Sequence, residues 1–447
     1  MNARHPDRNA FERFSRGGAS AAEERWIEDH LRSGCAVCQG EVDEILLRSF
    51  APPSEETAGQ DAAWDRLFAD LGVRLARAAA ERKEAPALLD ELLSRPWEEW
   101  PVLFRLDRRL QTIAVCELLI EKSFEEGFRD AARAIGLADR GLLLAGLLEG
   151  ERYGRAVVQD LQARAWAYLG NARRIAFDLA GAEEALARAE RLAEGGSADP
   201  LEEARILDLR ASLLSDQGHF EQAAELLDAV IDIYDDVHKP HRKGRAMVSK
   251  GHCLGYAGWH DEAIRQIRLG LGLVDWDREP RLVLMARHNL AWFLNDCGRA
   301  EEARRQLERF RHTYRELPGS FTELRLAWLD GRIAARLGRP DEAEPVLLEV
   351  RRRFLAEGNG YDAALVTLDL AHLYLEAGRA AEVRTLAAEM LDVFLSRDIH
   401  RQALAALAVF QKAAELDNAT PGLVQEISSY LVRARKNPGL RFAKAAA

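Results

Sequence analysis

From Leu201 to Leu395 the apolar residues recur with helical spacing, and this pattern breaks at a glycine every 40 residues. The glycines are Gly218, Gly258, Gly298, Gly338 and Gly378. Small residues stand seven positions before them (Ala211, Gly251, Ala291, Gly331, Ala371) and five positions after them (Ala223, Ala263, Ala303, Ala343, Val383). A fixed period of this length predicts stacked supersecondary units rather than one compact globule.

Residues 284–310 illustrate one unit. Leu290 and Leu294 belong to an apolar stripe with helical spacing, and the pattern stops at Gly298, which can adopt the left-handed conformation that ends a helix. A second stripe with Ala303 and Leu307 follows. The unit is therefore predicted to be a helical hairpin. Its small residues mark the places where the two backbones approach closely, since larger side chains there would overpack the contact.

This spacing resembles the tetratricopeptide repeat (TPR). The small residue, glycine and alanine of that family align with Gly251, Gly258 and Ala263, and the phrases GWHDEA, GRAEEA and GRPDEA resemble its turn signature. The resemblance implies an all-α fold, a right-handed α-solenoid of TPR-like hairpins with a period of about 40 residues. It also implies a protein or peptide partner, whose identity the family does not specify.

The rest of the chain divides around this array. The predicted parts are a small module at 1–50, a linker at 51–61, irregular helices at 62–199, regular repeats at 200–398, and capping helices with a tail at 399–447. Trp97 and Trp100 lie in a proline-interrupted segment and are expected to pack under a loop. Gly181 lies 37 residues before Gly218, so the stacking before residue 200 is expected to be irregular.

Composition narrows the class of protein. The net charge is −11 with 30% charged residues, which favours a water-soluble helical protein and makes nucleic acid an unexpected partner. The start of the chain does not resemble a signal peptide, and no apolar run reaches the ~20 residues of a membrane helix. The five cysteines are an odd count, which without a secretory context favours a reducing compartment. We therefore expect a cytoplasmic protein that makes no membrane contact.

The first fifty residues predict three short helices. Ser20 and Glu23 form a capping box at the start of the second helix. So small a unit buries little apolar surface and usually needs a further stabilising element. His30, Cys35 and Cys38 can supply it, because Cys-x-x-Cys with a nearby histidine suits tetrahedral Zn²⁺. His5 is the candidate fourth ligand; the alternative is a metal-free module whose cysteines pack.

The same stretch resembles the zinc-finger domain of bacterial anti-sigma factors. That resemblance carries His30, Cys35 and Cys38 over as zinc ligands, with His5 as the upstream ligand, although four residues separate His30 from Cys35 where the family has three. It implies a transcriptional regulator that contacts a sigma factor or another regulator. The alternative is a general TPR adaptor whose N-terminal module is purely structural.

No enzyme motif is present. The sequence lacks His-Glu-x-x-His, a P-loop, a dinucleotide-binding glycine motif and Gly-x-Ser-x-Gly, so we expect neither an enzyme nor a small-molecule substrate.

By the TPR resemblance, the first helix of each hairpin lines the partner groove. The implied partner-binding residues are Arg245, His252, Tyr256, His288, Asn289, Trp292, Asn295, Arg325, Trp328, Arg332, Arg336 and His372. Arg, His, Asn and Trp together form a mixture that anchors peptides and proteins. The alternative for Trp292 and Trp328 is packing between adjacent hairpins. Asp208 and Ser212 replace the Lys and Asn of the family's carboxylate clamp, which argues against capture of a chaperone C-terminus.

Overall fold

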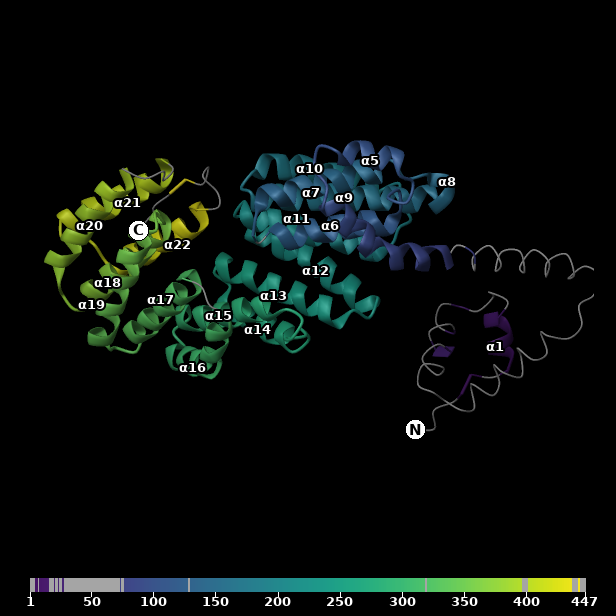
Figure 1. Cartoon of the computed structure of the whole chain (residues 1–447). Helices are drawn as coiled ribbons and strands as arrows, with labels where there is room; N and C mark the ends of the chain where they lie inside the picture. The colour runs from purple at the N-terminus through teal and green to yellow at the C-terminus, as the bar shows by residue number, and fades with distance from the viewer. Residues whose placement is uncertain are drawn as a thin grey trace, which may run out of the picture. The chain divides into compact units, whose positions relative to one another are not determined.

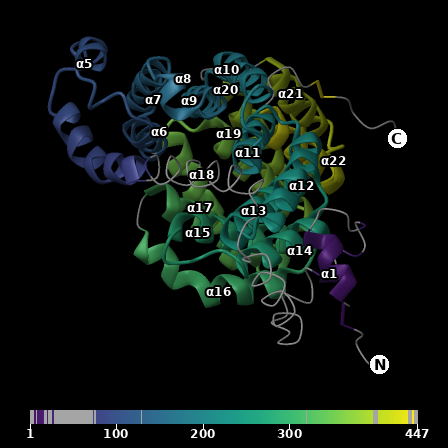
Figure 2. The same cartoon turned by 90° about the vertical axis from the view of Figure 1, so that its right-hand side faces the viewer.

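A computed structural model describes most of the chain from residue 76 onward (Figures 1 and 2). It covers 76–127, 129–317, 320–395, 401–435 and 441–442, and before them 5–6, 8–15, 20, 23, 26–27 and 73. The chain divides into two compact units, Met1–Lys83 and Glu84–Ala447. Within the described residues every regular element is a helix and no strand occurs, which confirms the all-α prediction there.

The described part of the first unit contains α1 (Arg8–Ser15) and the predicted capping box. The Ser20 hydroxyl accepts a hydrogen bond from the Glu23 backbone N–H at 3.3 Å, and the Glu23 carboxylate accepts one from the Ser20 N–H at 3.1 Å. The Ser20 N–H, the Arg13 guanidinium and the Ser20 hydroxyl donate to this carboxylate and lower the pKa of Glu23 to about 2. The predicted linker and the predicted ligands His30, Cys35 and Cys38 lie outside the described residues.

The second unit begins with helical residues 84–93, followed by paired helices. These are α5 (Trp100–Leu106), α6 (Ile113–Gly127), α7 (Ala131–Ala145), α8 (Gly150–Tyr153), α9 (Arg155–Ile175) and α10 (Leu179–Ala193). Trp97 stacks on Trp100 with ring centroids 5.0 Å apart, and the Trp100 side chain is fully buried. Both therefore pack into the core of this region, as expected.

The turn between α9 and α10 differs from the sequence expectation. Gly181 lies inside α10, and the left-handed turn residue is Phe177, with φ of 62°. Phe177 stands 41 residues before Gly218, so the hairpin keeps nearly the regular period although a phenylalanine replaces the glycine. A side chain in this conformation is strained, and the Phe177 side chain is 91% exposed. The sequence pattern did not predict this turn, because the repeat pattern marks such turns only by glycine.

Five regular hairpins follow, as predicted. They are α11 (Pro200–Asp216) with α12 (Phe220–Asp236), α13 (Pro240–Ala257) with α14 (His260–Leu271), α15 (Pro280–Asp296) with α16 (Ala300–Glu316), α17 (Ser320–Arg336) with α18 (Pro340–Ala356), and α19 (Gly360–Glu376) with α20 (Ala380–Leu395). Each repeat glycine has a positive φ, between 68° and 96°. Consecutive helices pack together, and their inward side chains form continuous cores that extend from hairpin to hairpin.

The C-terminal helices α21 (Arg401–Glu415) and α22 (Pro421–Ala434) form the predicted terminal pair. The α21 helix packs on α20, as a next first helix would. The α22 helix packs on α21 and also returns to α19, where Leu423, Ile427 and Tyr430 join the α19 core. The terminal pair therefore also covers part of the first-helix face of the preceding hairpin.

Candidate partner-binding groove

A groove of about 740 Å³ runs along the first helices α13, α15 and α17. Its central wall comes from α15, where residues 281, 285, 288, 289 and 292 follow the spacing of one helix face. The lining residues are Tyr256, Arg281, Leu284, Met285, His288, Asn289, Trp292, Tyr314, Glu316, Leu317, Thr322 and Arg325. Five of the twelve predicted partner-binding residues meet here: Tyr256, His288, Asn289, Trp292 and Arg325.

The Trp292 side chain in the groove is held in place by side chains of α17. Trp292 meets Trp328 edge to face with ring centroids 5.0 Å apart, and the Arg332 guanidinium lies 4.1 Å from the Trp292 ring centroid. Such contacts limit the rotamers of Trp292. Trp292 is half-buried, so one part of its ring packs while the rest can contact a ligand.

His288 is a neutral, polar member of the wall. Burial lowers its pKa to about 3, helped by the charges of Arg325 and Arg332. Its Nδ1 lies 2.9 Å from the Tyr314 hydroxyl, so the two side chains share a hydrogen bond. Asn289 is fixed in a similar way, because its Nδ2 lies 2.9 Å from Nδ1 of His252. These groups offer hydrogen bonds to a ligand without adding charge.

The groove also contains residues that the sequence analysis missed. Met285 is 58% exposed, a large apolar side chain open to solvent within a concave site. Arg281 is also exposed on the same face. Tyr314 and Leu317 come from the end of α16 and the turn after it. Arg281 and Met285 could have been predicted, because their spacing from His288 and Trp292 places them on the same helix face. Tyr314 and Leu317 are revealed only by the tertiary contact.

A second cavity of about 330 Å³ continues the groove toward α11. It shares Met285 and Asn289 with the first, so the two form one continuous surface. His252 lines this part together with Ser212 of α11. Arg245 lies on the same helix as His252 and forms an ion pair with Glu279 at 3.0 Å. The N-terminal half of the predicted set is thus close to an open groove.

The C-terminal part of the predicted set lies in a different environment. Asn295, Arg332, Arg336 and His372 line a narrow cavity of about 30 Å³ that is completed by Val424, Gln425 and Ser428 of α22. Two predicted anchors need correction. Asn295 and Trp328 are each only 1% exposed. Trp328 packs between hairpins, the alternative considered above, and donates its indole N–H to Asp369 at 2.7 Å.

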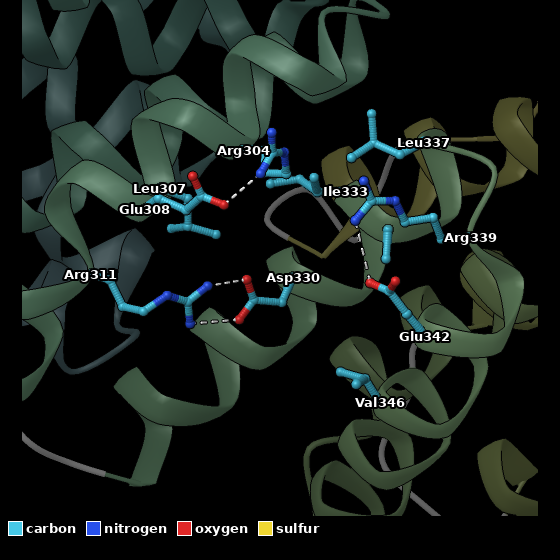
Figure 3. A pocket seen from close by; sticks show the side chains of 11 residues that line it. Arg304, Leu307, Glu308, Arg311, Asp330, Ile333, Leu337, Arg339, Glu342 and Val346 are labelled. Atoms are coloured by element: carbon cyan, nitrogen blue, oxygen red, sulfur yellow. Dashed lines mark hydrogen bonds and ion pairs between the residues drawn. The ribbon is translucent and has the colours of Figure 1, made fainter.

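A further pocket of about 280 Å³ lies between α16, α17 and α18 (Figure 3). Its floor is apolar, and its charged rim is already paired. Arg311 faces Asp330 in a two-pronged ion pair, and Arg304 donates to Glu308 at 2.7 Å. These charges therefore satisfy one another within the pocket.

The described residues contain no cluster of three or more His, Cys, Asp or Glu side chains that could hold a metal. Of the four predicted zinc ligands only His5 is described, so the fit of the set to Zn²⁺ stays a sequence prediction. Among the described helices none is long and apolar enough to cross a membrane.

Comparisons with known proteins agree with the repeat architecture. Residues 283–319, which include most of α15 and all of α16, match the tetratricopeptide repeat family. The crystal structure of a Rap protein complexed with Competence and Sporulation Factor is similar with a TM-score of 0.55 and 14% identity, covering 72% of this chain and 88% of that one. The crystal structure of aspartyl phosphate phosphatase F from Bacillus subtilis has a TM-score of 0.49 and 11% identity. That comparison covers 89% of this chain and 96% of the other. No curated protein sequence matches. At 14% identity the likeness to the Rap protein concerns the fold alone: a TPR-like helical repeat.

Proposed function

We propose that the chain is a protein-interaction scaffold whose α13–α15–α17 groove binds a polypeptide segment of a partner. The observation that carries this proposal is the exposed Met285 beside half-buried Trp292 in a groove of about 740 Å³. Cavities of roughly 300–1,000 Å³ bind compact ligands, and the adjoining 330 Å³ cavity lengthens the site toward that of an extended segment. A central aromatic and an arginine are the side chains that most often dominate protein binding energies.

The groove's chemistry also suits a peptide backbone. Asn289 and His288 present hydrogen-bonding groups without net charge, and an extended segment carries amide groups along its length. The similar Rap protein structure is a complex with Competence and Sporulation Factor. This supports the use of such a helical array for recognition, and the partner of the present chain would be set by its own groove residues.

The finer part of the proposal is that the chain regulates transcription in the cytoplasm. It rests on His30, Cys35 and Cys38, which with His5 would hold a Zn²⁺ ion and stabilise an anti-sigma-like module. In that case residues 1–50 contact a sigma factor and the groove binds another protein. The alternative is an adaptor in which the N-terminal module is only structural.

Pulldowns of the full-length protein from its native cell separate these possibilities. Met285→Glu places a charge in the groove and should remove the groove partner, whereas Leu348→Glu, at a 40% exposed position on α18, should not. Cys35→Ser with Cys38→Ser should remove a sigma factor and leave the groove partner bound. Retention of every partner by Met285→Glu would refute the groove. Absence of any sigma factor from the wild-type sample would refute the anti-sigma role and leave the adaptor.

A further inference from the structure

The position of α22 departs from the regular stacking. In the regular array each first helix packs on the second helix before it, and α21 follows this rule on α20. The α22 helix turns back onto α19, burying Val424, Ile427 and Leu431. It thereby covers part of the α19 face, and residues of α17, α19 and α22 line the remaining cavity of only about 30 Å³.

A buried carboxylate fixes this position. Asp362, in the first turn of α19, has no exposed surface. It accepts a hydrogen bond from Arg435, the C-cap of α22, at 2.8 Å, and one from Arg325 of α17 at 3.1 Å. Asn359 donates to the same carboxylate at 2.6 Å. A buried carboxylate between two guanidinium groups is stable only while its partners remain, because loss of either leaves charge poorly compensated.

Arg325 belongs to two sites at once. It binds Asp362 in this cluster, and it also lines the groove of about 740 Å³. A second connection runs in parallel. Trp292 of the groove wall packs under Arg332, and Arg332 donates to Asp369 at 3.2 Å, beside the narrow cavity closed by α22. The groove and the surface under α22 therefore share contiguous contacts through α17 and α19.

We propose that α22 is a clasp whose docking is coupled to the groove through Arg325 and Asp362. A segment in the groove that draws Arg325 away from Asp362 weakens the docking of α22. Undocking of α22 conversely removes Arg435 from Asp362 and changes how tightly Arg325 is held at the groove. Coupling between two sites is reciprocal, and here one shared side chain provides the physical connection. As regulation of the groove, the inference rests on the proposed function; the coupling itself is a property of the free protein.

Hydrogen–deuterium exchange of the full-length protein tests the coupling without any partner. The variants are Arg435→Gln and, as a matched control on the same helix, Arg433→Gln, whose side chain is exposed. Arg435→Gln should accelerate exchange about tenfold in residues 421–434 and severalfold in residues 322–330 of α17, which include the groove residues Thr322 and Arg325, since a charge-assisted bond is lost at Asp362. Arg325→Gln perturbs the groove side of the same cluster and should accelerate exchange in residues 421–434 of α22.

Two further measurements make the outcome decisive. Residues 200–236, in α11 and α12, should keep wild-type exchange in every variant, which separates local undocking from general unfolding. Arg435→Lys keeps the positive charge and should restore at least half of the lost protection. Wild-type exchange at 322–330 in Arg435→Gln, at 421–434 in Arg325→Gln, or equal effects from Arg433→Gln would overturn the proposal. None of these results depends on a partner, so failure of the proposed function would appear separately in the pulldown.

Discussion

A close approach of two helices in the described repeats can be tested by adding one methyl group. Gly251 of α13 and Gly331 of α17 occupy the same position in their hairpins. A Cβ at Gly251 would lie 2.5 Å from Cγ1 of Ile267 and 2.9 Å from the backbone oxygen of Ala263. A Cβ at Gly331 would meet the flexible end of Leu347, with its Cδ2 at 2.8 Å. The first clash includes a backbone atom, whereas the second involves side-chain atoms only.

These contacts predict different losses of stability for the same substitution at the two sites. Alanine stabilises a helix interior over glycine by about 1 kcal/mol, and overpacking costs about 1–3 kcal/mol. Gly251→Ala must separate α13 from α14 and should therefore lose up to about 2 kcal/mol. Gly331→Ala should cost less than Gly251→Ala, because its clash involves the side chain of Leu347 and no backbone atom.

The assay is urea denaturation of the two full-length variants followed by far-UV circular dichroism. Because a repeat array need not unfold in two states, amide exchange within 240–271 and 320–356 should accompany it. Gly251→Ala should shift the midpoint downward and raise exchange in α13 and α14. If Gly251→Ala equals or exceeds Gly331→Ala in stability, the argument from close backbone approach is wrong.

Four other expectations follow from the sequence and the structure. Gly298→Val should destabilise the array by at least about 1 kcal/mol in urea denaturation, because φ is 81° and a branched residue is strained there; a wild-type midpoint would contradict this. Trp328→Ala should cost about 3–5 kcal/mol in the same assay, since the ring is 1% exposed; a small loss would show that the ring is not a core group. The fold lowers the pKa of His288 from 6.5 to about 3, so the unfolded chain binds a proton that the folded chain does not. The free energy of unfolding should therefore fall as the pH drops from about 6.5 towards 3. His288→Gln should flatten this pH dependence between about pH 7 and 5, and an unchanged slope would refute the argument. Anaerobically purified protein should contain about one zinc per chain by elemental analysis and lose it in Cys35→Ser with Cys38→Ser; no zinc in the wild type would refute the metal site.

The sequence predicted the repeats well because their signals are local. A glycine such as Gly298 ends a helix through its own backbone conformation, and a small residue such as Ala291 marks a contact that recurs in every hairpin. The Ser20–Glu23 capping box is equally local, and the described structure contains it. The turn at Phe177 was not predicted because its left-handed conformation occurs at an exposed phenylalanine, and the repeat pattern marks such turns only by glycine.

The site was predicted only in part because accessibility is a tertiary property. Trp292 and Trp328 have the same residue type and lie on corresponding helices, yet the first lines the groove and the second is buried beneath it. Helical periodicity cannot separate these cases. Nor could it show that α22 covers His372, because that cover comes from a segment about fifty residues further along the chain. Met285 was missed because an apolar residue on a helix is usually assigned to the core.

Site-specific photocrosslinking tests the central claim most directly. A photoreactive phenylalanine analogue replaces Met285 in the groove or, as the control, Leu348 on α18, and the full-length protein is irradiated in its native cell. The account predicts a defined protein adduct from position 285 that is absent from position 348, with the crosslinked peptide of the partner identified by mass spectrometry. No adduct at position 285, or the same adducts at both positions, would contradict the assignment of the α13–α15–α17 groove as the partner-binding site.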